Sequence, residues 1–206
     1  YCSDFTRTIP VDGVFTQKQK EIYQIVLDAN NRAFELVREG IEYREIHIAA
    51  CMILTAGLKD LDIMKGDISD AVSQGAHALF MPHGLGHMIG LDVHDMEDLG
   101  EEYVGYDSQT KRATQFGTAY LRFAKKLKNG FALTIEPGIY FIPALIEMWK
   151  FENKFSNFIN YNVLDKYIGF GGIRLEDNVL VTKKAGKYIG KRIPITIEEI
   201  EKKMNE

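Results

Sequence analysis

Three of the five histidines in this 206-residue chain, His83, His87 and His94, lie within twelve positions. Gly84 and Gly86 separate the first two, and a glycine costs a helix about 1 kcal/mol relative to alanine. We therefore expect an irregular backbone that passes close to another group, such as a metal ion or a substrate. Taken singly, a histidine is more often a hydrogen-bonded structural residue, but three at this spacing favour a reaction centre.

Carboxylates occur in three strand-like segments. Glu136 ends the apolar run 131–135, where an unpaired charge would be costly. Glu176 lies in residues 173–181, where alternation of period two places it on a polar face. Asp4 lies in a third such segment near the start of the chain. An ordinary edge-strand charge is the alternative explanation for each acid taken alone, and for Asp4 alone it is the preferred one. These acids are the partners that a metal-binding histidine would need.

Carboxylate oxygens combined with an imidazole suit hard or borderline divalent ions, among them manganese, cobalt, iron and zinc. The sequence contains no Cys-x-x-Cys pair, which a soft ion would favour. Several acids with one histidine fit a pair of ions that share bridging carboxylates, activate water and polarise a carbonyl group. The chemistry that these residue types indicate is hydrolysis.

The chain resembles the metal-dependent peptidases of the pita-bread superfamily, which includes methionine aminopeptidase, aminopeptidase P and prolidase. The resemblance rests on four ordered blocks: SDFTRT, PHGLGHMIGLDVHD, LTIEPGIYF and GFGGIRLEDNVLVT. It is strongest for the proline-specific branch and extends from Ser3 to about Thr182. It implies an α+β fold in which helices cover a curved, mostly antiparallel sheet. The implied substrate is a small peptide with proline at its second position.

The resemblance also assigns roles residue by residue. The family binds two ions, with manganese expected first and cobalt, iron or zinc as alternatives, through two aspartates, one histidine and two glutamates. The residues that match four of these five ligands are Asp4, His87, Glu136 and Glu176. Glu136 is also tied to proton transfer, and Arg174 matches an arginine that orients the bridging glutamate or holds substrate. His83 and His94 match accessory catalytic histidines that contact the substrate and stabilise the tetrahedral intermediate.

One family ligand has no counterpart in this sequence. In the family, the first aspartate precedes the second by more positions than precede Asp4 here. We therefore interpret residues 1–206 as the C-terminal catalytic domain of a longer protein, incomplete at its N-terminus. On this interpretation the chain binds one ion better than two, and its activity in isolation is in doubt.

Arg122 bears on the choice of substrate. It lies fourteen positions before Glu136, and in the prolidase branch an arginine at that offset grips the free carboxylate of a dipeptide. A planar guanidinium suits this role because it makes two charge-assisted bonds to a carboxylate. An exposed helix arginine explains Arg122 equally well. We predict a Xaa-Pro dipeptidase (prolidase), with a Xaa-Pro aminopeptidase (aminopeptidase P) acting on longer peptides as the alternative.

Two other classes fit the motifs less well. A non-catalytic pita-bread binding module would be expected to lose metal ligands, whereas four are retained. A metal-free hydrolase of the creatinase type would not keep the whole ligand set. Metal analysis would separate these classes from a metallopeptidase.

The composition indicates the domain organisation and the kinds of partner that the chain has. The chain is 46% hydrophobic and 26% charged, which suits a single globular domain, and its net charge of −4 gives no sign of a nucleic-acid partner. No apolar run approaches a membrane span, so no membrane association is expected. Cys2 and Cys51 are too few for a disulfide framework. We predict a cytoplasmic protein, and carry homodimerisation of the full-length protein over from the family.

Three helices are predicted from caps and apolar spacing. A capping box at Thr16 begins a helix that Gly40 ends, and a second helix covers residues 43–56 and ends at Gly57. Another capping box, at Thr196, begins a short helix at the end of the sequence.

The remaining segments are less regular. Residues 66–78 and 95–115 are expected to be loops, and residues 118–128 a helix that carries Arg122. The aromatic-rich segment 143–167 is interpreted as packing on the core, with a pocket wall as the alternative.

Overall fold

The structure, a computed structural model, describes residues 3–206. Its sheet is organised around one long strand, β4 (Gly171–Val181), with which the other strands of the described sheet pair antiparallel. β2 (Ala132–Ile135) and β3 (Gly138–Phe141) follow one another along one edge of β4. β1 (Thr6–Arg7) and β5 (Gly186–Tyr188) lie along the other edge. The predicted strands at Glu136 and Glu176 are confirmed, and the predicted strand near Asp4 is limited to Thr6–Arg7 within the described residues.

The two strands beside β4 are separated by a break at Glu136 and Pro137. Proline has no N–H to donate to a ladder, and its carbonyl accepts from the N–H of Leu175 at 3.3 Å. The flanking register pairs Ile135 with Asp177 and Gly138 with Arg174. The break therefore places Glu136 beside the middle of β4, where Glu176 lies.

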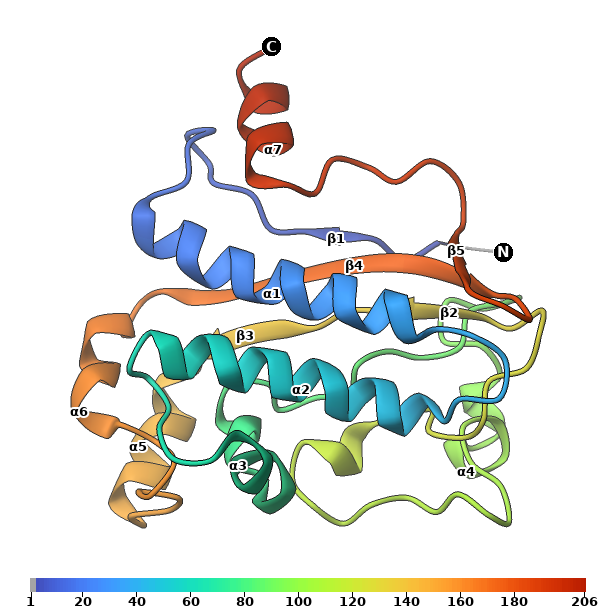
Figure 1. Cartoon of the computed structure of the whole chain (residues 1–206), viewed down its shortest axis with the longest axis horizontal. Coiled ribbons are helices and arrows are strands. Elements are labelled where there is room, and N and C mark those ends of the chain that lie inside the picture. Colours follow the sequence, from blue (N-terminus) through green and yellow to red (C-terminus); the bar gives the residue numbers. More distant parts are fainter. Residues whose placement is uncertain (1–2) are drawn as a thin grey trace.

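Two long helices cover one face of the sheet. α1 (Gln17–Leu36) and α2 (Tyr43–Asp60) run antiparallel to each other across it (Figure 1). The buried side chain of Asn30 in α1 donates hydrogen bonds to the carbonyls of Ile135 and Leu175, at 3.2 and 3.3 Å. These bonds join α1 to β2 and β4 next to the break, so the helix supports the backbone that carries the acids.

The predicted helix starts are confirmed, but the two glycine stops are wrong. Thr16 and Gln19 form the capping box of α1, which ends at Leu36, before Gly40. α2 continues through Gly57 to Asp60. A Cβ at Gly57 would lie only 2.5 Å from Cγ1 of Ile25. This glycine therefore permits close packing of α1 on α2 and does not end a helix.

Two other predictions are also corrected. Residues 66–78 form α3 (Ile68–Gln74) and η1 (Ala76–Leu79), because the side chain of Asp67 caps α3 by accepting the N–H of Asp70. Residues 118–128 form only the short η3 (Thr118–Tyr120). The backbone beyond η3 bonds instead to distant segments: the Tyr43 N–H donates to the carbonyl of Lys125 at 3.1 Å, and Ala124 N–H to that of Gly105 at 2.8 Å. Arg122 therefore lies in an irregular segment and not on a helix.

The other elements lie at the periphery. Residues 95–115 are mainly irregular, as predicted, and contain η2 (Glu97–Leu99) and α4 (Glu101–Val104). The remaining helices are α5 (Pro143–Phe151), α6 (Tyr161–Leu164), η4 (Asp165–Tyr167) and α7 (Ile197–Met204). Thr196 and Glu199 form the predicted capping box of α7. The predicted packing of segment 143–167 is confirmed for the buried Trp149 and Phe158, whereas Phe151 is 93% exposed. None of the helices formed by residues 3–206 has both the length and the apolar character that crossing a membrane requires.

Candidate active site

The histidine segment lies along the free edge of β2. The N–H of Thr134 donates to the carbonyl of His87 at 2.9 Å, and that of Glu136 to the carbonyl of Leu85 at 2.8 Å. Ile89 N–H donates to the carbonyl of Ala132 at 3.1 Å. The segment thus continues the sheet without forming a regular strand, and this pairing brings His87 next to Glu136.

Gly84 and Gly86 permit the backbone to lie this close. A Cβ at Gly86 would lie 2.3 Å from the carbonyl oxygen of Thr134 and 2.5 Å from the hydroxyl of Tyr43. At Gly84 it would lie 2.6 Å from Cα of Leu121. The close approach predicted from the sequence is therefore confirmed for protein atoms, and both glycines also line the cavity described below.

His87 points between two carboxylates. Its Nε2 atom lies 3.4 Å from Oδ2 of Asp4 and 3.5 Å from Oε1 of Glu136. Its Nδ1 atom is 2.9 Å from the carbonyl of Met88 and donates to it. This bond fixes the ring and leaves the Nε2 lone pair facing the acids, as in histidines that ligate metals.

Glu176 completes the group of acids. Its side chain is 1% exposed, and its Oε2 atom accepts a 2.7 Å hydrogen bond from the hydroxyl of Thr6. Its Oε1 atom is buried and has no hydrogen-bond partner among the described residues. Donor atoms of His87, Glu136 and Glu176 lie within 4.8 Å of one another, as do those of Asp4, His87 and His94. An unpaired buried oxygen among converging acids fits a bound cation.

Burial controls the protonation of these groups. It raises the pKa of Glu136 to about 8, with a further contribution from the neighbouring charge of Glu176. The pKa of Glu176 rises to about 7, again chiefly through burial. Burial also lowers the pKa values of His83 and His87, which favours neutral imidazoles. A divalent ion would stabilise both ionised glutamates and accept the lone pair of a neutral histidine.

Arg174 and Thr6 connect the two glutamates. Nε of Arg174 lies 3.8 Å from Oε2 of Glu136 and 4.0 Å from Oε2 of Glu176. Its Nη2 atom donates to the hydroxyl of Thr6 at 3.0 Å, while Thr6 donates to Glu176. Thr6 is a site residue that we did not select from the sequence. The sequence did contain a signal for Thr6, because it lies two residues after Asp4 and therefore on the same side of a strand.

His83 is held by two hydrogen bonds. Its Nδ1 atom donates to the carbonyl of Gly84 at 2.7 Å, so its Nε2 atom accepts from the hydroxyl of Tyr140 at 3.2 Å. Tyr140 was also missed, although it lies an even number of positions after Glu136 in the strand pattern.

His94 lies beside His87 but has a different partner. The ring centroids are 4.3 Å apart and the rings are nearly perpendicular. Nη1 of Arg122 donates to Nδ1 of His94 at 3.0 Å and to Oε2 of Glu97 at 2.5 Å. Because Nδ1 of His94 accepts this bond, the ring proton lies on Nε2, where it can donate to a substrate.

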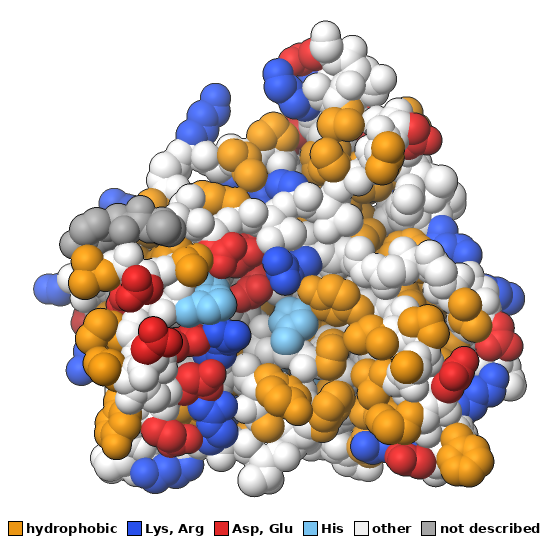
Figure 2. Space-filling model, turned by 180° about the vertical axis from the view of Figure 1, so that it is seen from behind, with side chains coloured by type: hydrophobic (Ala, Val, Ile, Leu, Met, Phe, Trp, Pro, Cys, Tyr) orange, Lys and Arg blue, Asp and Glu red, His pale blue; other side chains and the backbone are white. Residues whose placement is uncertain are grey.

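Most of the residues of this site line one cavity of about 640 Å³. It lies on the face of the molecule opposite α1 and α2, where two histidines, several acids and basic side chains gather in a hollow (Figure 2). The residues that line it are Asp4, Pro82, His83, Gly84, Gly86, His87, His94, Glu101, Arg112, Tyr120, Arg122, Glu136 and Arg174. The structure thus brings together all of the predicted site residues: Glu176 is buried behind this wall, and the others line it.

Every arginine of the described cavity wall is paired with an acid. Arg122 pairs with Glu97, and Arg174 lies within 4.0 Å of two glutamates. Arg112 pairs with Glu101 and Glu102. The segment predicted only as a surface loop, residues 95–115, supplies most of these partners.

Comparisons with known proteins agree with this geometry. Residues 1–183 match the model of metallopeptidase family M24. The chain is 38% identical over 201 residues to a probable Xaa-Pro aminopeptidase pepP of Aspergillus clavatus, covering 98% of this chain and 41% of that protein. A probable Xaa-Pro aminopeptidase of Sordaria macrospora is also 38% identical, with the same coverage.

Solved structures give the same result. An aminopeptidase PepP from Pseudomonas aeruginosa has a TM-score of 0.75 and 34% identity, covering 100% of this chain and 38% of that one. The zinc-substituted aminopeptidase P of Escherichia coli, in complex with product, has the same values. The predicted pita-bread fold and superfamily are therefore confirmed. The chain spans about two fifths of the length of these relatives. Those named here are aminopeptidases, so they do not confirm prolidase as the first choice.

Proposed function

The chain belongs to metallopeptidase family M24, and on that premise we propose that it is the catalytic part of a metal-dependent Xaa-Pro aminopeptidase. Such an enzyme hydrolyses the peptide bond between an N-terminal residue and a following proline. The observation that carries the proposal is the convergence of His87, Glu136 and Glu176, with an unpaired buried oxygen on Glu176. We assign residues 1–206 to the C-terminal catalytic domain of the whole protein.

Asp4, His87, Glu136 and Glu176 would hold the metal. Three carboxylates and one imidazole suit manganese first, with cobalt, iron and zinc as alternatives. When bound, the metal lowers the pKa of a water molecule and polarises the carbonyl that the water attacks. We propose two ions for the complete protein, as the family resemblance implies.

The chain's own residues move the proton and orient the substrate. Glu136 is placed to take the proton of the attacking water and pass it to the proline nitrogen as the peptide bond breaks. His94 carries a proton on Nε2 and would donate it in a hydrogen bond to the developing oxyanion. His83, which lines the cavity and is held by the hydroxyl of Tyr140, would contact the substrate. Arg174 and Thr6 hold the two glutamates at their observed spacing.

The paired arginines favour longer peptides over dipeptides. A prolidase must bind the free carboxylate of a dipeptide, and Arg122 was the predicted clamp. In the structure, Arg122 already forms a 2.5 Å ion pair with Glu97, and the other arginines of the described cavity wall are also paired. A substrate that continues beyond proline brings no carboxylate to this position. Prolidase is kept as the second candidate because Arg122 does line the cavity.

Hydrolysis of Gly-Pro and of Gly-Pro-Ala by the full-length protein tests the proposal, first with manganese and then with a chelator. We expect metal-dependent cleavage of the tripeptide. Cleavage restricted to Gly-Pro would establish prolidase, and cleavage of neither peptide would favour a non-catalytic binding module. A cytoplasmic location, and a homodimer of the full-length protein, remain part of the proposal.

A further inference from the structure

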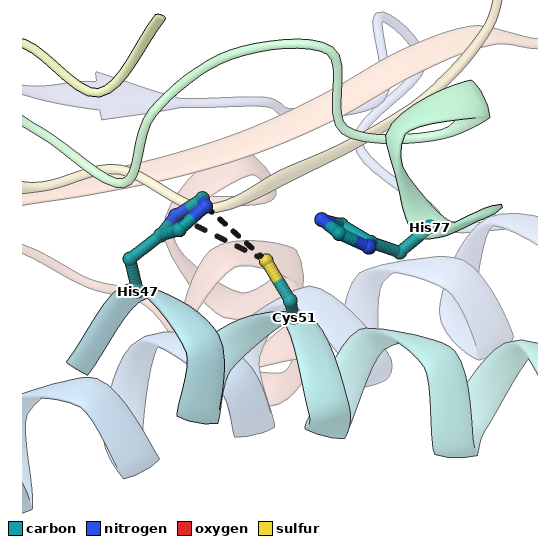
Figure 3. Close-up of side chains that lie close together, drawn as sticks. All are labelled: His47, Cys51 and His77. Carbon is teal, nitrogen blue, oxygen red and sulfur yellow. Dashed lines mark hydrogen bonds between the residues drawn. The ribbon is translucent and has the colours of Figure 1, made fainter. Parts of the chain in front are cut away.

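A second group of metal-ligating side chains lies in the core, outside the catalytic cavity. His47 and Cys51 are one turn apart on α2, and His77 lies in η1 and faces them (Figure 3). His47 and Cys51 are fully buried, and His77 is 3% exposed. None of the three lines the catalytic cavity, and the proposed peptidase mechanism uses none of them.

The distances within this cluster suit ligands of one ion. The Sγ atom of Cys51 lies 3.7 Å from Nε2 and 3.9 Å from Nδ1 of His47. One donor atom from each of the three residues lies within 4.8 Å of the other two. Ligand atoms about 2.0 to 2.3 Å from a common tetrahedral zinc ion are separated by somewhat less than this. A small inward movement of His77 would therefore bring the three donor atoms to the spacing of ligands on one ion.

The second observation is the lack of partners for His77. In a neutral imidazole one ring nitrogen is a hydrogen-bond donor and the other is an acceptor. Neither Nδ1 nor Nε2 of His77 has a hydrogen-bond partner among residues 3–206. The hydroxyl of Thr55, one turn beyond Cys51 on α2, is also buried without one. Buried polar atoms are paired in nearly all native structures, and each exception requires an explanation. A bound ion supplies one, because it takes the lone pair of His77.

We propose that His47, Cys51 and His77 form a structural zinc site between α2 and η1. One thiolate and two neutral imidazoles are a donor set of intermediate softness, which suits zinc and contrasts with the carboxylates of the catalytic cavity. On binding, the Cys51 thiol loses its proton to solvent and the sulfur takes its place as a ligand, with no change of oxidation state. Burial keeps both imidazoles neutral, which leaves their lone pairs free for the ion.

The position of the site gives it a structural role. Solvent and peptide substrates do not reach it, so the ion enters as the chain folds. η1 leads within a few residues to His83, and the carbonyl of Phe80 accepts from the N–H of Tyr140 at 2.8 Å. Zinc would therefore fix the segment that begins the catalytic histidine motif against the helix behind it.

Cobalt substitution tests the site through the absorption of a thiolate bound to cobalt, which the catalytic centre does not give because its proposed ligands include no thiolate. The protein is expressed in cobalt-supplemented medium, and the near-ultraviolet charge-transfer band of a thiolate bound to cobalt is recorded. We expect this band for the wild type. The Cys51→Ala variant should lose the band and should also lose one equivalent of bound metal. Cys2→Ser, which changes the only other cysteine of residues 1–206, is the matched control and should keep both the band and the metal. No thiolate band in the wild type, or a band that persists in Cys51→Ala, would overturn the proposal.

A measurement on the wild type keeps the test independent of how the variants fold. The metal-free protein is refolded with zinc, or with manganese alone. Protein refolded with zinc should have a Tm several degrees higher than protein refolded with manganese alone. It should also contain one tightly bound zinc ion more than the number of ions that manganese can replace. His77→Phe, which keeps a ring in the core, should abolish the zinc-specific shift. Equal Tm values with zinc and with manganese would refute a structural zinc site.

Discussion

The chain contains two histidine clusters that differ in what surrounds them. In the catalytic cavity, His87 lies between carboxylates, and the neighbouring cations are paired with acids. In the core, His47 and His77 lie beside the thiol of Cys51 and are sealed from solvent. The same side chain therefore lies in two different environments. Oxygen ligands and an open cavity suit hydrolysis, whereas a buried thiol and imidazoles suit a structural ion.

The strongest test of this contrast is His87→Ala. We expect the variant to lose both active-site metal and peptidase activity, because the imidazole is the only nitrogen ligand in the proposed set. The loss in kcat/KM should exceed the roughly 100-fold that follows removal of an outer-shell partner. Metal content and hydrolysis of Gly-Pro-Ala are measured together. His77→Phe is the control from the other cluster and should keep the catalytic metal. Full metal occupancy in His87→Ala would refute the assignment.

The His94→Ala variant distinguishes metal ligands from accessory residues within the cavity. Its ring lies next to that of His87 and hydrogen-bonds to Arg122, so we expect metal to stay bound while kcat falls by about 100-fold, as for a lost oxyanion donor. Kinetics and metal analysis on the same preparation check this. Loss of metal would instead make His94 a ligand, for which its proximity to Asp4 and His87 provides the geometry.

The proposed active-site cluster was predictable from sequence because its acids lie at positions where a charge without a partner would be costly. Glu136 follows a buried strand, and Glu176 alternates on a polar face, so the pattern marked both as acids that need a partner. The family resemblance then assigned both to the metal site. Thr6 and Tyr140 follow the same alternation and were missed because a hydroxyl has many ordinary roles. The pairing of Arg122 with Glu97 was not predictable, because it depends on how an irregular loop folds back over the cavity.

The core cluster was not predicted at all. His47 and Cys51 have helical spacing, but His77 comes from a turn that the sequence did not reveal. The same limit explains the errors in helix boundaries. A glycine that ends a helix and one that permits two helices to pack look alike in a sequence, and only the contact of Gly57 with Ile25 separates them.

The core cluster should also make the metal-free protein sensitive to acid. Burial lowers the pKa of His47 to about 3 and that of His77 to about 4. Between these values and about 6.5 the unfolded chain binds protons that the folded chain does not, so stability falls as pH falls. Each histidine contributes about 1.4 kcal/mol per pH unit in this range. Urea unfolding with a chelator, from pH 7.5 to 5, should show a shallower acid slope for His77→Phe. Identical slopes would show that His77 is protonated in the fold.

The smallest expected effect concerns the charge balance of the cavity. Glu97→Gln leaves Arg122 without its acid, since the 2.5 Å ion pair is lost. An unpaired guanidinium at the cavity wall would attract the free carboxylate of Gly-Pro but not a peptide that continues beyond proline. We expect KM for the dipeptide to fall about five-fold, corresponding to about 1 kcal/mol for a partly exposed pair, with Gly-Pro-Ala unchanged. The double variant Glu97→Gln with Arg122→Gln should cancel the gain. If Arg122→Gln alone impairs dipeptide hydrolysis, Arg122 already acts as the clamp, and the enzyme is a prolidase.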